Sequence, residues 1–207
     1  MIIPTESRTK NQIFEDWKKT NPKTTWSVYW LDYQEKLINL YEKLNWWIVP
    51  ISPIDKTPLK GFKWKNRSLI YDKIIKYYLS NKINIAVNLK KSNLIAIDLD
   101  SNKIPPVVKE LIYMTYSQIT RTSHYHLLFK YDKKFSDKAI KELGNKITTA
   151  SEFSFRGGNN EEYILISPSR LPLKENDNIS SDKYYEFFNL DKLMNFSDLM
   201  EMINEIG

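Results

Sequence analysis

The sequence predicts an α+β fold with a largely antiparallel or mixed sheet. Apolar residues recur at helical spacing in some stretches and as short β-rich runs in others, and the two patterns are interspersed. The stretch Gly-Gly-Asn-Asn at 157–160 separates two β-rich runs, which is the pattern of a hairpin. With 42% hydrophobic and 14% aromatic residues among 207, the chain can bury a substantial core and is not expected to be mainly disordered.

The first half of the chain is expected to contain both helices and strands. Leu37, Tyr41 and Leu44 have helical spacing, and Asn45 ends that helix. Pro50 assigns the first strand to an edge or an end of a sheet, because proline has no amide proton for the ladder. The expected elements are helices over 31–44 and 69–79 and strands over 46–51, 83–88 and 93–100.

The second half continues this mixture. The Pro-Pro pair at 105–106 opens a helix that runs to about Tyr116, and Ser136 caps a short helix that ends before Gly144. From Asp182 onward the pattern is helical and acidic. The expected strands cover 118–122 and 125–131, with the two hairpin strands over 151–156 and 161–167.

Charge is unevenly distributed over three segments. We expect a peripheral arm over 1–30, a main domain over 31–173 and an acidic helical segment over 174–207 that packs on the main domain. The last segment carries 3 Lys against 8 acidic residues, whereas the 173 residues before it carry 28 basic against 17 acidic ones. A basic body suits a polyanionic partner such as nucleic acid or nucleotide phosphates, although a lysine-rich surface needs no such partner.

Composition excludes several classes of site. The chain has no cysteine, so disulfides, cysteine-bound zinc, iron–sulfur clusters and thiol nucleophiles are excluded. With only two histidines, a multi-histidine metal site is excluded as well. No apolar run approaches the ~18 residues of a membrane span, and the first residues do not resemble a signal peptide. We therefore expect a soluble intracellular, cytoplasmic protein with no membrane partner.

Two carboxylates follow the apolar run at 94–97. Asp98 and Asp100 are two positions apart, so on a strand they share one face. Carboxylates placed in this way repel each other unless a cation lies between them, and such hard oxygen ligands suit Mg²⁺ or Mn²⁺. In two-metal phosphoryl transfer, carboxylates hold ions ~3.5–4 Å apart. The alternative is an ordinary turn, since Asp, Ser and Asn are turn formers.

Two further strands carry polar faces of interest. His124 and His126 are expected to share one face, where an imidazole could bind a metal or a phosphate oxygen. Glu152, Ser154 and Arg156 alternate onto one face of the expected hairpin. There Glu152 could be a third metal ligand and Arg156 a phosphate clamp. A plain polar strand face would account for both patterns.

The loop after the first strand is basic. Lysines alternate there with an aromatic residue, which suits contact with a nucleotide or a single strand of nucleic acid. A solvated lysine loop is the alternative. The residues concerned are Lys56, Lys60, Lys63, Trp64 and Lys65.

In their order along the chain, these motifs resemble a known family. The set comprises the Lys56-x-Pro58 loop with Trp64, the strand pair before Asp98-x-Asp100, and the histidine before Leu-Leu-Phe at 127–129. It ends with the expected hairpin, which finishes in Tyr-Ile-Leu-Ile-Ser-Pro-Ser at 163–169. Over about 37–169, the sequence resembles the prim-pol domain of the archaeo-eukaryotic primase superfamily. It is most similar to the primase–polymerase domains of archaeal plasmid replication proteins.

This resemblance implies a fold, a reaction and a site. The fold would be an RRM-like catalytic sheet with flanking helices and an additional α/β half. The reaction would be templated nucleotidyl transfer from a dNTP or NTP, on a DNA template and primer, by a DNA primase and DNA polymerase. The chain would belong to a larger replication protein with a helical or helicase domain. The usual zinc-binding insertion needs cysteines, so no zinc is expected.

The resemblance also assigns roles to residues. Asp98 and Asp100 match ligands of two Mg²⁺ or Mn²⁺ ions, and His126 matches a histidine that contacts the phosphates of the incoming nucleotide. The third carboxylate falls on Ser154 or on Glu152, and we expect Glu152 because serine cannot replace an anionic ligand. Further nucleotide contacts would come from Arg121, Ser123, His124, Arg156 and Lys56.

Two other functions remain open from the sequence. The His-Tyr-His stretch at 124–126 also fits the metal site of HUH nicking endonucleases, with Tyr78 as a nucleophile in a Tyr-x-x-x-Lys pattern. That alternative leaves the two aspartates unexplained. The second alternative is a non-catalytic nucleic-acid-binding module on a decayed primase fold.

Overall fold

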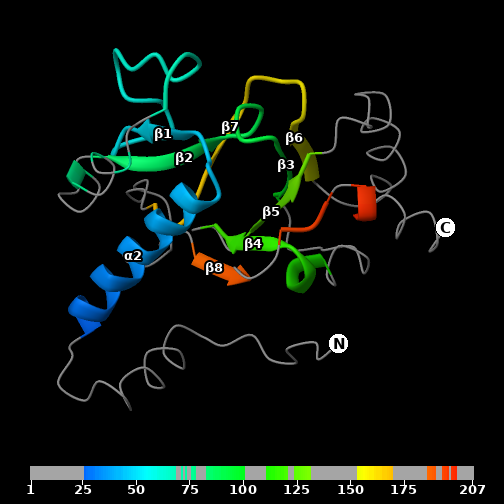
Figure 1. Cartoon of the computed structure of the whole chain (residues 1–207), viewed down its shortest axis with the longest axis horizontal. Coiled ribbons are helices and arrows are strands. Elements are labelled where there is room, and N and C mark those ends of the chain that lie inside the picture. The colour runs from blue at the N-terminus through cyan, green and yellow to red at the C-terminus, as the bar shows by residue number, and fades with distance from the viewer. Residues whose placement is uncertain are drawn as a thin grey trace.

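The structure is a computed structural model in which the described residues form two antiparallel sheets and a long helix (Figure 1). It describes residues 26–68, 71, 73, 76–77, 83–100, 111–120, 124–131, 153–169, 186–189, 193–195 and 197–199. Within them, none of the helices is long and apolar enough to cross a membrane. The helix expected over 136–144 and the strand residues 121–122 lie outside the described part of the chain.

Helix α2 (Trp26–Lys43) covers the core beside the first strand. It begins before the expected residue 31 and ends as expected, because Asn45 adopts a positive φ of 54°. Leu37, Ile38 and Tyr41 form its buried face. Residues 71, 73, 76 and 77 are also helical, in agreement with the helix expected over 69–79.

Sheet A contains three strands in the order β1–β2–β7. They are β1 (Ile48–Ile51), β2 (Asn84–Asn88) and β7 (Tyr163–Leu165). The edge position predicted for β1 is confirmed, and Pro50 lies opposite Ile85 in the register. One face of the sheet packs under α2, and Val49, Ile51 and Leu165 are buried on the other.

Sheet B contains five strands in the order β6–β3–β5–β4–β8. Its central strand, β3 (Leu94–Leu99), is buried along its whole length. Leu94 and Ala96 face the core shared with α2, whereas Ile95 and Ile97 face a second core on the other side. The remaining strands are β4 (Tyr116–Ile119), β5 (Tyr125–Lys130), β6 (Phe153–Gly157) and β8 (Glu186–Asn189).

The hairpin predicted around 157–160 is wrong. Strand β6 pairs with β3 in sheet B, and β7 pairs with β2 in sheet A. Figure 1 shows the connection running from β6 across to β7 beside β2. Gly157 and Gly158 do make a turn, with φ of 93° and 64°, but it redirects the chain between sheets. A turn motif in the sequence predicts that the chain changes direction, but it does not predict with which strand the following strand pairs.

Two other expectations need correction. Residues 186–189 form a strand at the edge of sheet B, although a helical pattern was expected from Asp182. The segment is rich in aromatic residues, which favour a pleated surface when an open strand edge is available. Tyr116 begins β4 and does not continue the preceding helix, whose described residues are 111–114.

A buried tyrosine pair holds the helix, sheet B and the segment after β7 together. The Tyr41 hydroxyl donates to the Ser167 carbonyl at 2.7 Å and lies 3.0 Å from the Tyr116 hydroxyl. Trp46 stacks on Tyr41 with ring centroids 5.1 Å apart. These contacts fix the end of sheet A against sheet B, where the candidate site lies.

Candidate functional site

Four polar residues form one row across sheet B. In the register of the sheet, Gln118 of β4 lies opposite His126 of β5, His126 opposite Asp98 of β3, and Asp98 opposite Ser154 of β6. Side chains alternate along each strand, so Asp98 shares the face of Ala96. The pleat thus collects these side chains on the face of sheet B that looks toward sheet A.

Asp98 contacts two cationic or potentially cationic side chains. The residue is 7% exposed, and its Oδ2 accepts a hydrogen bond from Arg156 Nε at 2.7 Å. Its Oδ1 lies 3.3 Å from His126 Nε2. Burial alone would raise the pKa of Asp98, but the contacts with His126 and Arg156 outweigh it and hold the pKa below 3.8. The carboxylate is therefore ionised at neutral pH.

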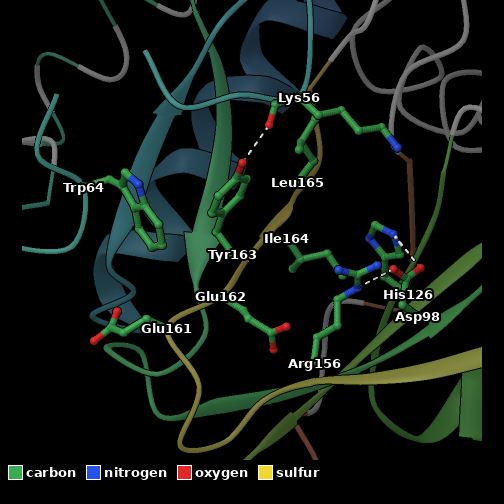
Figure 2. A pocket seen from close by; sticks show the side chains of 10 residues that line it. All are labelled: Lys56, Trp64, Asp98, His126, Arg156, Glu161, Glu162, Tyr163, Ile164 and Leu165. Carbon is green, nitrogen blue, oxygen red and sulfur yellow. Dashed lines mark hydrogen bonds and ion pairs between the residues drawn. The ribbon is translucent and has the colours of Figure 1, made fainter. Parts of the chain in front are cut away.

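A pocket of about 350 Å³ opens beside this row (Figure 2). Sheet B supplies Asp98, His126 and Arg156, whereas β7 and the loop after β1 supply the apolar and aromatic wall. Further charged groups come from Lys56 in that loop and from Glu161 and Glu162 just before β7. The Tyr163 hydroxyl donates to the Lys56 carbonyl at 3.0 Å, which ties that loop to β7. The lining residues are Lys56, Trp64, Asp98, His126, Arg156, Glu161, Glu162, Tyr163, Ile164 and Leu165.

The turn after β6 fixes the position of Arg156. Gly157 donates its N–H to Glu162 Oε2 at 2.6 Å, which anchors the turn. A Cβ on Gly157 would lie 2.8 Å from both Leu89 Cβ and the Leu94 carbonyl oxygen, so only glycine fits. The backbone beside Arg156 is therefore held tightly against β3.

The second aspartate and the serine of the row are neighbours of Asp98, the first in sequence and the second in the register of the sheet. Asp100 lies just past β3, where its side chain is 62% exposed and 4.0 Å from His124 Nδ1. Ser154 Oγ is buried and has no hydrogen-bond partner among the residues that the structure describes. Two carboxylates near an unsatisfied hydroxyl fit a hard divalent cation. Within the described ranges, however, no group of three His, Cys, Asp or Glu residues could hold a metal.

The loop between β1 and β2 places aromatic rings and cations together. Trp64 packs edge-on against Tyr163 with centroids 5.1 Å apart, and its carbonyl oxygen accepts a hydrogen bond from Trp47 Nε1 at 2.9 Å. Each of three aromatic rings of this region carries a cation over its face. The pairs are Lys65 on Trp64 at 5.4 Å, Arg67 on Phe62 at 4.7 Å, and Lys91 on Trp47 at 5.7 Å.

The structure brings part of the predicted site together. Asp98, His126, Arg156, Lys56 and Trp64 all line the pocket. A second group of predicted residues is described but does not line it: Asp100, His124, Ser154, Lys60, Lys63 and Lys65. Glu152, Arg121 and Ser123 lie outside the described residues.

Sequence reasoning missed several residues of the pocket and its surroundings. Glu162 and Tyr163 line the pocket because β7 belongs to sheet A, which the hairpin prediction concealed. Gln118 is buried beside His126, and its only sequence signal was its position within an expected strand. The pair of Trp47 and Lys91 was missed because it joins residues on either side of β1 and β2. The pair of Phe62 and Arg67 was missed because it lies in a loop, where spacing alone does not predict contact.

The fold and the site define a class of protein. It is an α+β protein whose two sheets enclose an ionised carboxylate, cationic side chains and an aromatic wall, a combination suited to phosphorylated ligands. Residues 37–195 match the family model described as the bifunctional DNA primase/polymerase N-terminal domain, Prim-Pol. The chain belongs to this family, which confirms the resemblance. Membership implies a DNA primase/polymerase-type function with nucleic acid and nucleotide substrates. A search of curated proteins finds no significant match.

Proposed function

We propose that this chain catalyses templated nucleotidyl transfer. A primer 3′-hydroxyl oxygen attacks the α-phosphorus of a bound dNTP or NTP and forms a new P–O bond. The bond from that phosphorus to the bridging oxygen breaks, pyrophosphate leaves with the electron pair, and the hydroxyl proton passes to solvent. The observation that carries this proposal is the ionised Asp98, held between Arg156 and His126 at the pocket.

Divalent metal ions, Mg²⁺ or Mn²⁺, are part of the proposal. Asp98 and Asp100 would hold them, with Glu152 as the expected third carboxylate. Bound there, the ions would lower the pKa of the attacking hydroxyl and neutralise charge on the triphosphate. The buried, unpartnered Ser154 hydroxyl beside the ionised carboxylate of Asp98 supports a cation at this end of β3.

The cationic side chains of the pocket would bind the triphosphate. Arg156 is 41% exposed in its side chain, so its guanidinium can reach a ligand while Nε stays near Asp98. His126 would donate a hydrogen bond from Nε2, and Lys56 would add charge from the opposite wall. Such groups, placed before the reaction begins, stabilise the charge that develops on the phosphates. Arg121, Ser123 and His124 are further nucleotide contacts in this proposal.

The basic loop would contact the template strand. Lys60, Lys63 and Lys65 are exposed beside Trp64, which itself reaches the pocket wall. Bases stack on aromatic rings whatever their identity, and lysines bind the backbone phosphates between them. A template lying on this loop would therefore lead into the pocket. From the resemblance alone, we further propose that the chain serves plasmid replication in an archaeal host as part of a larger cytoplasmic replication protein.

Primer extension tests the proposal. A labelled primer–template is incubated with dNTPs and Mg²⁺ or Mn²⁺, using wild type, an Asp98→Ala/Asp100→Ala double variant, and Asp55→Ala as a matched control. Asp55 is a fully exposed carboxylate in the loop after β1. The proposal predicts templated extension that only the double variant loses. DNA binding without extension would contradict it and favour a binding module. A tyrosine-linked DNA product would favour the nickase.

A further inference from the structure

Gln118 makes three hydrogen bonds that use its whole carboxamide. The residue is 0% exposed. Its Oε1 accepts the Ser167 N–H at 2.9 Å, and its Nε2 donates to the Leu165 carbonyl at 2.6 Å. The same Nε2 lies 2.7 Å from His126 Nδ1. The amide of a β4 residue thus reaches both β7 of sheet A and β5 of sheet B.

The two backbone contacts determine which end of the amide is oxygen. A backbone N–H can only donate, so the atom facing Ser167 is the carboxamide oxygen. A backbone carbonyl can only accept, so the atom facing Leu165 is the nitrogen. A flipped amide would place two donors together at one contact and two acceptors at the other. The nitrogen therefore also faces His126.

This orientation determines the tautomer of His126. The Gln118 nitrogen carries two protons, one for the Leu165 carbonyl and one directed at His126 Nδ1. Nδ1 must then accept, and the proton of the neutral ring is on Nε2. Nε2 points to the pocket side, where it lies 3.3 Å from Asp98 Oδ1 (Figure 2).

We propose that Gln118 is a positioning residue, which holds His126 as the Nε2–H tautomer so that this N–H is presented to the pocket. The inference rests on the proposed function in one respect: the phosphate oxygens of a nucleotide would receive that hydrogen bond. Without Gln118, the ring could carry its proton on Nδ1 and present a lone pair to an anion. The bond to Leu165 also fixes the spacing between the two sheets at the pocket.

Nitrogen NMR tests the tautomer directly in the whole chain. Protein labelled with ¹⁵N-histidine gives two-bond correlations between ring protons and nitrogens, which distinguish the Nε2–H and Nδ1–H tautomers. The chain has only two histidines, and His124 serves as an internal reference. We expect the neutral ring of wild-type His126 to show the Nε2–H pattern. An Nδ1–H pattern, or an averaged mixture of the two tautomers, would overturn the proposal without any variant.

Two substitutions on β4 distinguish a role of Gln118 in orienting His126 from a role in packing alone. Gln118→Glu keeps an acceptor for Ser167 and presents a carboxylate to Nδ1, so we expect His126 to gain a proton on Nδ1. Ser117→Ala is the matched control, because Ser117 is equally buried but bonds the Ile112 carbonyl at 2.6 Å, away from His126. An unchanged His126 pattern in Gln118→Glu, or the same change in Ser117→Ala, would overturn the proposal.

Kinetics then separate this inference from the proposed function. If the chain extends primers, Gln118→Glu should lower kcat about 10- to 100-fold and leave the KM for primer–template unchanged. The size of this effect is taken from metal-binding histidines whose hydrogen-bond partner is removed. An unchanged kcat would overturn the positioning role. A wild-type protein with the Nε2–H pattern but no nucleotide incorporation would contradict the proposed function alone.

Discussion

Ser154 lies directly opposite Asp98 in the pairing of β6 with β3, and its buried hydroxyl has no hydrogen-bond partner within the described structure. A neutral hydroxyl therefore occupies the position where a carboxylate would face the ionised Asp98 at close range. Without a bound cation, a carboxylate there would be repelled, so serine favours the metal-free protein. An anionic third ligand, if the site has one, must come from a residue other than Ser154.

Substitutions at Ser154 should have opposite effects depending on their charge. Ser154→Ala removes an unsatisfied buried hydroxyl, so we expect the free energy of unfolding to stay within about 0.5 kcal/mol of wild type or to rise. Ser154→Asp adds a like charge beside Asp98, so it should lower the metal-free stability by about 1–3 kcal/mol and tighten Mn²⁺ binding. Urea unfolding in EDTA and Mn²⁺ titration followed by electron paramagnetic resonance measure both.

A comparison of Glu152→Gln with Ser154→Ala tests the choice of Glu152 as the third carboxylate. Glu152→Gln should reduce primer extension by more than about 100-fold, because a neutral amide is a far weaker metal ligand. Ser154→Ala should retain most of the wild-type rate. The reverse result, in which Ser154→Ala abolishes extension and Glu152→Gln does not, would assign the position to Ser154.

Loss of the Asp98 carboxylate should also change the dependence of stability on pH. Its pKa lies below 3.8 in the folded protein, so it stabilises the fold above that pH, and the contribution is lost as the pH falls through the folded value. Asp98→Asn should lower stability by about 1–2 kcal/mol at pH 7, a modest value because Arg156 is partly exposed. Urea unfolding in EDTA between pH 7 and pH 2 should show a flatter acid limb for the variant. A limb as steep as that of wild type would contradict the ion pair.

Two glycines with positive φ should respond differently to alanine. Gly157→Ala forces a Cβ to 2.8 Å from a backbone oxygen and from Leu89, so it should cost about 2 kcal/mol or more. Gly61 has φ of 81° and nothing within 4 Å of an added Cβ. Gly61→Ala should therefore cost only about 1 kcal/mol, from backbone strain alone. Thermal unfolding compares the two variants, and equal losses would contradict the close approach at Gly157.

The basic loop should contribute to nucleic-acid affinity in a salt-dependent way. Lys63→Ala and Lys65→Ala should weaken binding of single-stranded DNA and reduce the slope of log K against log salt by about 0.7 for each lost phosphate contact. Lys36→Ala, on an exposed position of α2, is the matched control. Fluorescence anisotropy across a salt series measures these slopes. A slope that falls equally in all three variants would contradict a specific role for the loop.

Part of the fold was predictable because its information is local. The buried runs at 84–88 and 94–99 show as short apolar segments, and alternation on a strand placed Asp98 and His126 on defined faces. The break at Asn45 was predictable because asparagine tolerates a positive φ. These predictions needed no knowledge of which strands pair.

Pairing between distant strands could not be predicted in the same way. The turn at 157–160 has the composition of a hairpin, yet whether β7 turns back onto β6 or joins β2 depends on which apolar surface it buries. Gln118 became recognisable only when the register placed it beside His126. A lone glutamine in a strand has no sequence signal, since its role comes from Leu165 and Ser167 far along the chain.

The pairing of β7 with β2 affects the order in which the protein can fold. Sheet A pairs Ala86 with Leu165, so the nascent chain must extend past β7 before the third strand of this sheet can be added. Loop-closure entropy rises only slowly with length, but contacts between distant segments still slow the search for the native state. Until that closure, the pocket lacks its Tyr163–Leu165 wall and Gln118 lacks two of its partners. A ribosome-bound chain that has not yet exposed β7 would therefore carry Asp98 on β3 without the pocket around it.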